Sequence, residues 1–195
     1  MTPRTWSADA PTTDDTRALA GRLAAHLRAG DLLVLSGPLG AGKTTFVQGL
    51  GAALGVRGTI ASPTFVIARE HPPLGDGPGL VHVDAYRLGG AGELDALDLD
   101  SSLEESVTVV EWGGGTAEPL ADSRLDVVLT RPVGDTRTAG GMNSSGGTNT
   151  AGGAAAEQPG DADELADTDE PRLVEITAHG PRWAGVDLSD VTGPR

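Results

Sequence analysis

Residues 32–44 read LLVLSGPLGAGKT, an apolar run followed by a glycine-rich turn and a lysine. The last eight satisfy the pattern G-x-x-x-x-G-K-[ST], in which backbone N–H groups of the turn point inward and bind phosphate oxygens. The context fits this motif. The run 32–35 is typical of a strand buried on both faces, and apolar residues then recur at helical spacing until Gly55: Phe46, Val47, Leu50 and Leu54. The stretch therefore predicts a strand, a phosphate-binding loop and a helix.

Lys43 is the only lysine among the 14 basic residues of the chain. A compact ammonium enters a crowded phosphate site as a point charge, so we assign Lys43 to the β- and γ-phosphates and the Thr44 hydroxyl to Mg²⁺. Guanine selection in GTPases generally uses an Asn/Thr-Lys-x-Asp segment, and the chain has no second lysine to build one, so ATP is the predicted nucleotide. The predicted phosphate-binding residues are Gly37, Pro38, Leu39, Gly40, Ala41, Gly42, Lys43, Thr44 and Thr45.

Helices and strands alternate along the rest of the chain. A helix is predicted from Thr12 or Thr13 to Gly30, with a further helix over residues 94–105. Strands are predicted at residues 65–67, 80–83, 107–110, 125–129 and 173–176. The pattern predicts an α/β fold: a P-loop NTPase-like three-layer sandwich with a central, mostly parallel sheet and an antiparallel part.

Two predicted strands run into an acid at their carboxyl ends. Residues 80–84 read LVHVD and residues 107–111 read VTVVE. If both strands lie parallel to residues 32–35, Asp84 and Glu111 reach the phosphates, where one acid would ligate Mg²⁺ and the other orient water. The alternative is that these acids only cap the next turn. We interpret His82 as a satisfied core residue rather than a metal ligand.

Thr64 and Trp112 are further candidates. Pro63 constrains the loop at residues 62–65, SPTF, so the Thr64 hydroxyl suits a sensor of γ-phosphate or Mg²⁺; an ordinary Ser/Thr turn is the alternative. Trp112 follows Glu111 and precedes three glycines. We expect Trp112 to contact nucleotide or a partner, with a core-edge aromatic as the alternative.

The composition bounds the function. The chain has 195 residues, no cysteine, 3% aromatic residues and a net charge of -14. One core is expected, disulfides and thiolate chemistry are excluded, and a groove that holds nucleic acid by bulk charge is disfavoured. No stretch approaches the roughly 18 apolar residues of a membrane span, so a soluble, cytoplasmic protein without a membrane partner is expected.

Charge divides the chain into three parts. Residues 134–170 carry eight acids against one base, with paired glycines and almost no large apolar side chains. We predict a P-loop ATPase core at residues 1–133, a disordered Gly-rich acidic insert at 134–170, and the final strand of the core with a tail at 171–195. The insert is a solvated loop between two strands or, alternatively, a regulatory or partner-binding segment.

Four blocks in this order resemble the TsaE (YjeE-like) family of bacterial P-loop ATPases: residues 37–44, 62–65, 82–87 and 110–113. The likeness covers about residues 12–133 and a last strand near 172–178. It implies an ATP-hydrolysing protein, slow alone, that is required for threonylcarbamoyl modification of the adenosine next to the anticodon in tRNAs reading A-starting codons. The implied partners are the TsaB and TsaD subunits, TsaD being the transferase, so tRNA would be contacted only indirectly.

The resemblance also implies roles for single residues. Carried over by position, the Mg²⁺ ligands fall on the Thr44 hydroxyl and the Glu111 carboxylate. Asp84 takes the acidic position that assists hydrolysis and Thr64 the switch-like threonine; with Lys43 they are the predicted catalytic residues.

Other positions match less closely or depart from the family. Trp112 matches the second residue of the family's Glu-Trp pair and joins the predicted nucleotide-binding residues. Thr12 or Thr13 matches a region near the adenine. The chain departs from the family pattern in the insert and at His71, where an aromatic residue is usual.

Two other functions stay open. A small-molecule or nucleoside kinase would use the same P-loop, but such kinases usually close an arginine-bearing lid, and the lid-length segment 134–170 has Arg137 as its one base. A nucleotide-dependent interaction module would bind ATP and hardly hydrolyse it alone.

Overall fold

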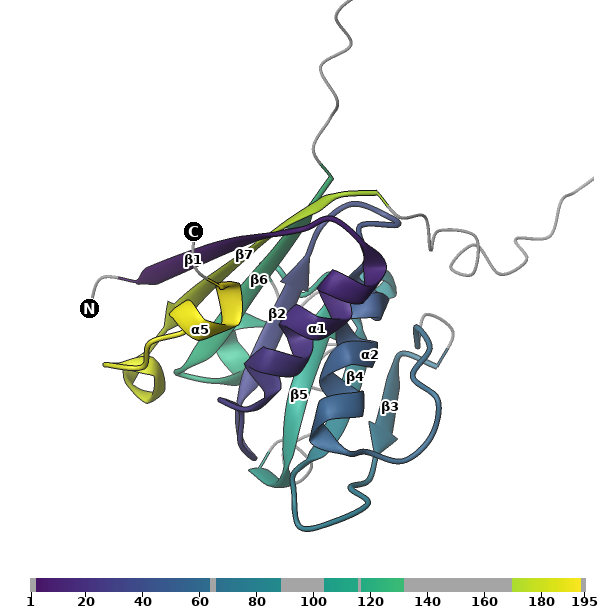
Figure 1. The fold of residues 1–195 in the computed structure, drawn as a ribbon. Coiled ribbons are helices and arrows are strands. Elements are labelled where there is room, and N and C mark those ends of the chain that lie inside the picture. The colour runs from purple at the N-terminus through teal and green to yellow at the C-terminus, as the bar shows by residue number, and fades with distance from the viewer. Residues whose placement is uncertain (1–2, 64–65, 89–103, 116, 132–169, 194–195) are drawn as a thin grey trace, which may run out of the picture.

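The computed structural model describes residues 3–63, 66–88, 104–115, 117–131 and 170–193. These residues form one seven-stranded sheet in the order β1-β7-β6-β2-β5-β4-β3 (Figure 1). The strands are β1 Arg4–Ala10, β2 Leu32–Ser36, β3 Ala68–His71, β4 Gly79–Asp84, β5 Ser106–Glu111, β6 Arg124–Thr130 and β7 Arg172–His179. The helices are α1 Thr13–Ala24, α2 Lys43–Leu54 and α5 Ser189–Thr192, with 3₁₀ turns η1 Ala85–Arg87, η2 Glu118–Leu120 and η3 Pro181–Trp183.

The centre of the sheet is parallel and its edges are antiparallel. Strand β2 pairs in parallel with β5 and β6, and β5 pairs in parallel with β4. The pairs β1–β7, β6–β7 and β3–β4 are antiparallel. Among the described strands, β3 and β7 therefore run opposite to the other five. The predicted α/β class, with a mostly parallel sheet and an antiparallel part, is confirmed.

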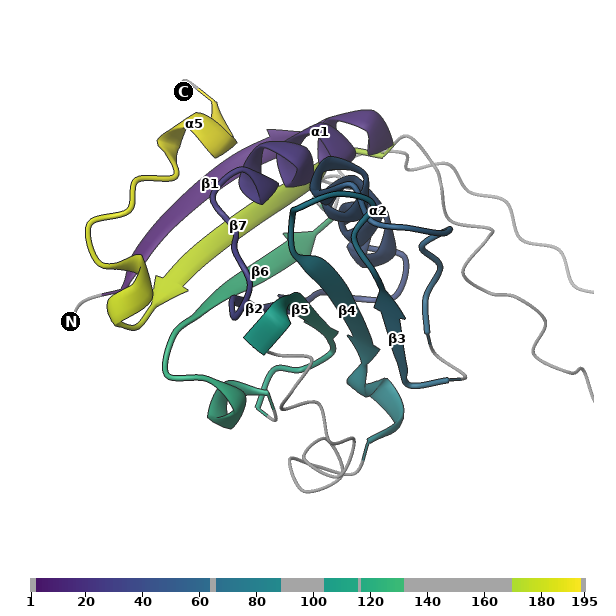
Figure 2. The same ribbon diagram turned by 90° about the horizontal axis from the view of Figure 1, so that it is seen from below.

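Alternating side chains build a core on each face of the sheet. Leu33 and Leu35 pack with the apolar residues of α1 and α2, and both helices lie on the same side of the sheet in Figure 2. Leu32 and Val34 point to the other face, where they join a smaller cluster with Ala117. Within the described ranges Ala85, Leu88 and the segment 117–121, which includes η2, pack on this second face and form the third layer.

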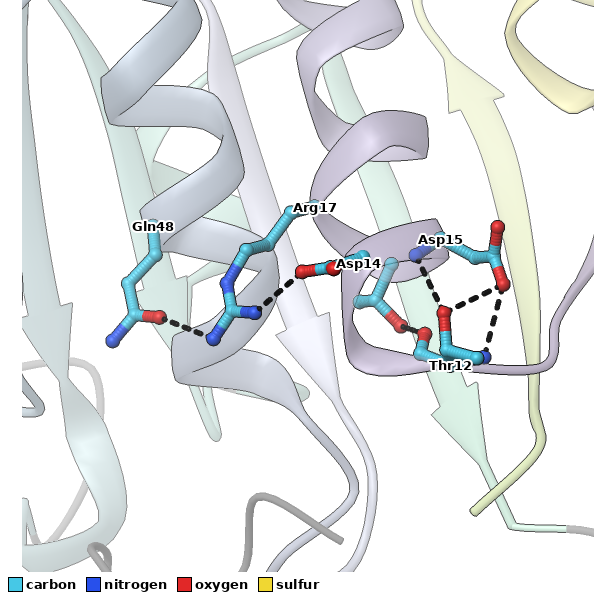
Figure 3. A network of polar contacts seen from close by, with 6 residues as sticks. Thr12, Asp14, Asp15, Arg17 and Gln48 are labelled. Atoms are coloured by element: carbon cyan, nitrogen blue, oxygen red, sulfur yellow. Dashed lines mark hydrogen bonds and ion pairs between the residues drawn. The ribbon is translucent and has the colours of Figure 1, made fainter. Parts of the chain in front are cut away.

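Helix α1 begins with a capping box. The Thr12 hydroxyl accepts from the Asp15 N–H at 3.1 Å, and the Asp15 carboxylate accepts from the Thr12 N–H at 3.1 Å (Figure 3). The expected end at Gly30 is wrong, because the α-helix stops at Ala24. The N–H groups of His26 and Leu27 bond three residues back, in a tightened turn that leads toward β2.

Helices α1 and α2 pack closely together. A Cβ on Gly49 would lie 2.4 Å from the Arg17 carbonyl oxygen, so only glycine permits this approach. The Arg17 guanidinium donates to Asp14 at 3.0 Å and to Gln48 of α2 at 3.4 Å (Figure 3). This contact fixes α1 against the helix that follows the phosphate-binding motif.

Two strand assignments differ from the sequence-based expectation. The predicted strand at residues 65–67 is wrong: Val66 lies in a turn and Ile67 has a left-handed φ of 68°, so the strand begins at Ala68. Strand β1 was not predicted, because the apolar alternation in RTWSADA is limited to Trp6, Ala8 and Ala10, and alanine favours strands only weakly. Pairing with β7, from the other end of the chain, holds it in the sheet.

Several predictions fall outside the described residues. These are the switch-like Thr64, residues 94–103 of the helix predicted over 94–105, and all of the insert except Glu170. The division of the chain into a core, an insert and a final strand stays a prediction. Within the described ranges, every helix is too short or too polar to cross a bilayer.

Candidate nucleotide-binding site

The loop between β2 and α2 needs glycine at two points. A Cβ on Gly37 would lie 2.3 Å from the Leu129 carbonyl oxygen, so no larger residue fits there. Gly42 has a left-handed φ of 96° and stands at the N-cap of α2, where it provides no side-chain cap. The loop therefore leads into the positive end of a twelve-residue helix. This is the geometry that binds an anion.

Lys43 extends along this loop. Its Nζ donates to the carbonyl oxygens of Gly37 and Pro38, each at 3.2 Å, and lies 3.9 Å from the centroid of the Trp112 ring. The side chain is only 5% exposed. A phosphate oxygen binds an ammonium more strongly than a neutral carbonyl or a ring face does, so Lys43 would gain from an incoming phosphate.

Trp112 reaches Lys43 from the end of β5, the strand that pairs with β2. It follows β5 directly, has a left-handed φ of 60°, and donates its backbone N–H to the Leu35 carbonyl at 2.9 Å. Its ring contacts Tyr86, with centroids 5.3 Å apart. An aromatic pair thus lies beside the lysine at the phosphate loop; its role toward nucleotide or a partner stays a prediction.

Glu111 ends β5 and meets the first turn of α2. Its Oε1 accepts from the Thr44 hydroxyl at 3.1 Å and lies 2.8 Å from His82 Nε2. Glu111 is 3% exposed and His82 is fully buried. Although 67 positions separate Thr44 from Glu111, the parallel pairing of β2 with β5 brings the carboxylate to the loop.

Asp84 ends β4 directly opposite Glu111 in the register of the sheet. Its Oδ1 accepts from the Tyr86 N–H at 3.0 Å, and its Oδ2 accepts from the Ser62 hydroxyl at 3.3 Å. The first bond caps η1, so Asp84 does cap the following turn, and its role in hydrolysis stays a prediction. The second bond ties Asp84 to the loop that leads to Thr64.

Period-two alternation gives these polar residues a common face. His82, Asp84 and Glu111 alternate with Val83 and Val110, which belong to the core of the opposite face. No group of three or more His, Cys, Asp or Glu side chains suited to a metal occurs among the described residues. One carboxylate and one hydroxyl suit Mg²⁺, which usually completes its shell with phosphate oxygens and water. Thr44 and Glu111 therefore fit Mg²⁺ bound together with a nucleotide.

Two arginines at the loop were missed by the sequence analysis. Arg131 donates to the Gly40 carbonyl through Nε at 3.1 Å and Nη2 at 2.6 Å, and pairs with Glu170 at 3.2 Å. The buried Arg172 side chain lies against Gly42, where an added Cβ would come within 3.3 Å of its Nε. Arg131 directly follows β6, the neighbour of β2, and Arg172 begins β7, the next strand of the sheet. Nothing in the local sequence indicates these contacts, because they depend on the antiparallel pairing of β6 with β7.

His71, where the chain departs from the family pattern, lies away from this site. His71 pairs with Leu80 at the amino end of β4, whereas Asp84 is at the carboxyl end. Its ring bonds the Arg57 carbonyl at 3.2 Å through Nδ1. Burial lowers the pKa of His71 below its usual value, which favours the neutral ring. The residue fills a structural position and leaves the loop unaffected.

Comparisons with known proteins agree with this geometry. Residues 10–139 match the family described as "Threonylcarbamoyl adenosine biosynthesis protein TsaE". The tRNA threonylcarbamoyladenosine biosynthesis protein TsaE of Streptomyces coelicolor is 51% identical over 91% of this chain and 99% of its own. The proteins of the same name from Mycobacterium tuberculosis and Bacillus subtilis are 52% and 40% identical, each over 64% of this chain, and over 79% and 77% of their own.

A solved structure has the same architecture. The crystal structure of Bacillus subtilis YdiB superposes with a TM-score of 0.60 and 28% identity, covering 94% of this chain and 92% of that one. The match to the family spans the β2 loop, both strand-end acids and the Trp112 ring. From the sequence match, the fold and these relatives, the chain belongs to the TsaE family of tRNA threonylcarbamoyladenosine biosynthesis proteins.

Proposed function

We propose that this protein binds and hydrolyses ATP with Mg²⁺ and that it thereby serves the TsaB–TsaD complex. That complex would carry out threonylcarbamoyl modification of the adenosine next to the anticodon in tRNAs reading A-starting codons. The relatives named above are tRNA threonylcarbamoyladenosine biosynthesis proteins, which supports the pathway. The ATPase and its partners rest on the site itself and on the family resemblance.

One contact carries the proposal: the hydrogen bond from the Thr44 hydroxyl to Glu111 Oε1, 3.1 Å long. It joins the hydroxyl of a phosphate-binding loop to a buried strand-end carboxylate. Phosphoryl transfer needs both groups at the cation beside the γ-phosphate. A loop that bound phosphate only as a structural anion would not need a buried acid at this position.

Each side chain has a defined task in this proposal. Lys43 exchanges its carbonyl contacts for the β- and γ-phosphate oxygens, and backbone N–H groups of residues 39–44 hold the phosphate chain. Thr44 and Glu111 would hold Mg²⁺, which when bound neutralises charge on the β- and γ-phosphates. Asp84 accepts hydrogen bonds beside Glu111 and orients, or takes a proton from, the attacking water.

The surroundings of the loop suit a protein partner. Four large apolar side chains are exposed in the described residues, and three of them flank this end of the sheet: Leu39 in the loop, Val66 and Tyr86. Exposed apolar residues gathered at one place favour contact with another protein. The net charge of -14 disfavours direct binding of tRNA, which would be held by the partner.

Phosphate release, measured with and without TsaB and TsaD, tests the proposal. We expect slow Mg²⁺-dependent release by the protein alone and faster release with both partners. Lys43→Ala is the matched control. Losing a buried charge contact costs about 3 kcal/mol or more, so ATP should bind at least roughly 100-fold more weakly. Release that ignores the partners, together with phosphorylation of a nucleoside, would instead identify a kinase.

A further inference from the structure

His82 is buried beside the proposed Mg²⁺ ligand Glu111 and has no role in the function described so far. It is fully buried on β4, and its Nε2 lies 2.8 Å from Glu111 Oε1. Its other ring nitrogen, Nδ1, is also buried and has no hydrogen-bond partner among the described residues. A leucine or phenylalanine would fill such a core position without the cost of burying a polar ring. The single bond to Glu111 is therefore what distinguishes histidine here.

The contacts assign the ring proton. An ionised carboxylate only accepts hydrogen bonds, so Nε2 is the donor to Glu111. A proton on Nδ1 would be buried with no acceptor among the residues that the structure describes. The arrangement therefore selects the tautomer with its proton on Nε2.

Both hydrogen bonds to Glu111 end on the same oxygen. Thr44 and His82 each donate to Oε1, from α2 and from β4. In the described part of the chain, this leaves Oε2 as the oxygen without a donor. When Thr44 turns its hydroxyl oxygen to a cation, the His82 bond is the one that still fixes the carboxylate.

We propose that His82 is a positioning residue that donates from Nε2 to Glu111 Oε1 and holds this carboxylate in place for Mg²⁺. The inference rests on the proposed function of Glu111 as a cation ligand and extends it to a residue behind that ligand. Partners that orient a metal ligand in this way typically contribute about 10- to 100-fold in metal affinity.

Three substitutions separate the hydrogen bond from the packing. In His82→Gln the side-chain amide nitrogen takes the place of Nε2, three bonds beyond Cβ, and keeps the donor to Glu111. In His82→Asn the amide ends at the place of Nδ1 and cannot reach Glu111. His82→Leu fills most of the volume and has no donor.

The measurement is the binding of a non-hydrolysable ATP analogue by calorimetry, at a series of Mg²⁺ concentrations and without Mg²⁺. The quantity compared is the Mg²⁺ concentration that gives half of the Mg²⁺ effect on nucleotide binding. We expect this concentration to be about tenfold or more higher in His82→Asn and His82→Leu than in wild type, and within about threefold of wild type in His82→Gln. Binding without Mg²⁺ should be unchanged in all three. Thermal unfolding, measured in parallel, shows which variants are folded.

The outcomes distinguish two failures. A normal Mg²⁺ response in His82→Asn and His82→Leu, with Glu111→Gln needing more Mg²⁺ than wild type, would overturn the role of His82 alone. Equal loss in all three variants would also overturn it, because packing would then explain the effect. A wild-type protein whose nucleotide binding ignores Mg²⁺ would overturn the metal role of Glu111 and that of His82 with it.

A second measurement uses the unmodified chain. Nitrogen-15 spectra of the imidazole rings distinguish the two tautomers, and the chain has only 4 histidines. We expect the buried ring of His82 to carry its proton on Nε2. A proton on Nδ1 with a bare Nε2 would contradict the inference directly, whatever the variants do.

Discussion

Glu111 and Asp84 stand opposite each other on adjacent strands and are both almost fully buried, yet their partners come from different parts of the molecule. Glu111 is hydrogen-bonded to Thr44 in the first turn of α2 and to the buried His82 ring on β4. Asp84 bonds the backbone of η1 and the hydroxyl of Ser62. One acid is thus tied to rigid elements and to the phosphate loop, and the other to loop segments.

The difference suggests a division of work between the two acids. A carboxylate held by a helix and a strand keeps its position when substrate enters, which suits a cation ligand. A carboxylate held by loop groups can exchange those bonds for a water molecule when the loop moves. Substitutions at the two acids should therefore differ most in how they respond to Mg²⁺.

Glu111→Gln should have the largest effect. The amide keeps the size of the side chain but loses the charge that holds Mg²⁺, so hydrolysis should fall by about 10³-fold or more, with ATP still bound through Lys43. Added Mg²⁺ should restore part of the rate. Phosphate release over a Mg²⁺ titration measures this, and hydrolysis at the wild-type rate would refute the metal assignment.

Asp84→Asn should come next, at about 10²-fold, the lower end of what a positioned base contributes. Its Mg²⁺ requirement should match that of wild type, in contrast with Glu111→Gln. The same titration checks both variants. If Asp84→Asn shifted the Mg²⁺ requirement as strongly as Glu111→Gln, both acids would act on Mg²⁺ and the proposed division of work between them would be wrong.

Arg131→Ala should act on the loop and leave both acids intact. Gly40 loses two hydrogen bonds from a charged group, so the KM for ATP should rise by about tenfold with kcat nearly constant. Steady-state kinetics separates the two constants. A fall in kcat alone would show that Arg131 acts on the chemical step instead.

Ser62→Ala should have the smallest effect. The variant removes one neutral donor from Asp84, a bond worth about 1 kcal/mol, so the rate should change by about fivefold at most. The Mg²⁺ requirement should not move. Comparing Ser62→Ala in the wild-type and Asp84→Asn backgrounds tests the contact, because its effect should vanish once Asp84 is changed.

The sequence predicted the parts of the site that follow from local pattern. The spacing of glycine, lysine and threonine predicts the loop at residues 37–44. The apolar runs before Asp84 and Glu111 predict strands β4 and β5, and the structure has both. The contact between His82 and Glu111 could also have been predicted from the sequence. Parallel pairing sets Asp84 beside Glu111, and period two turns His82 to the same face.

The remainder depends on contacts between distant segments. The apolar alternation of strand β1 is short, and the strand is held by β7, at the far end of the chain. The beginning of β3 is set by the left-handed Ile67, whose N–H bonds the Pro63 carbonyl. Arg131 reaches Gly40 across the sheet. No window of neighbouring residues contains these pairings.

Because Lys43 is the sole lysine and its Nζ lies 3.9 Å from the Trp112 ring centroid, the protein contains its own spectroscopic reporter. Isotope labelling of lysine alone would give a single side-chain amine, under the ring current of one indole. Any ligand that draws this ammonium off the aromatic face would move that resonance. Occupancy of the loop could then be followed in a mixture of proteins, without a dye or an engineered tag.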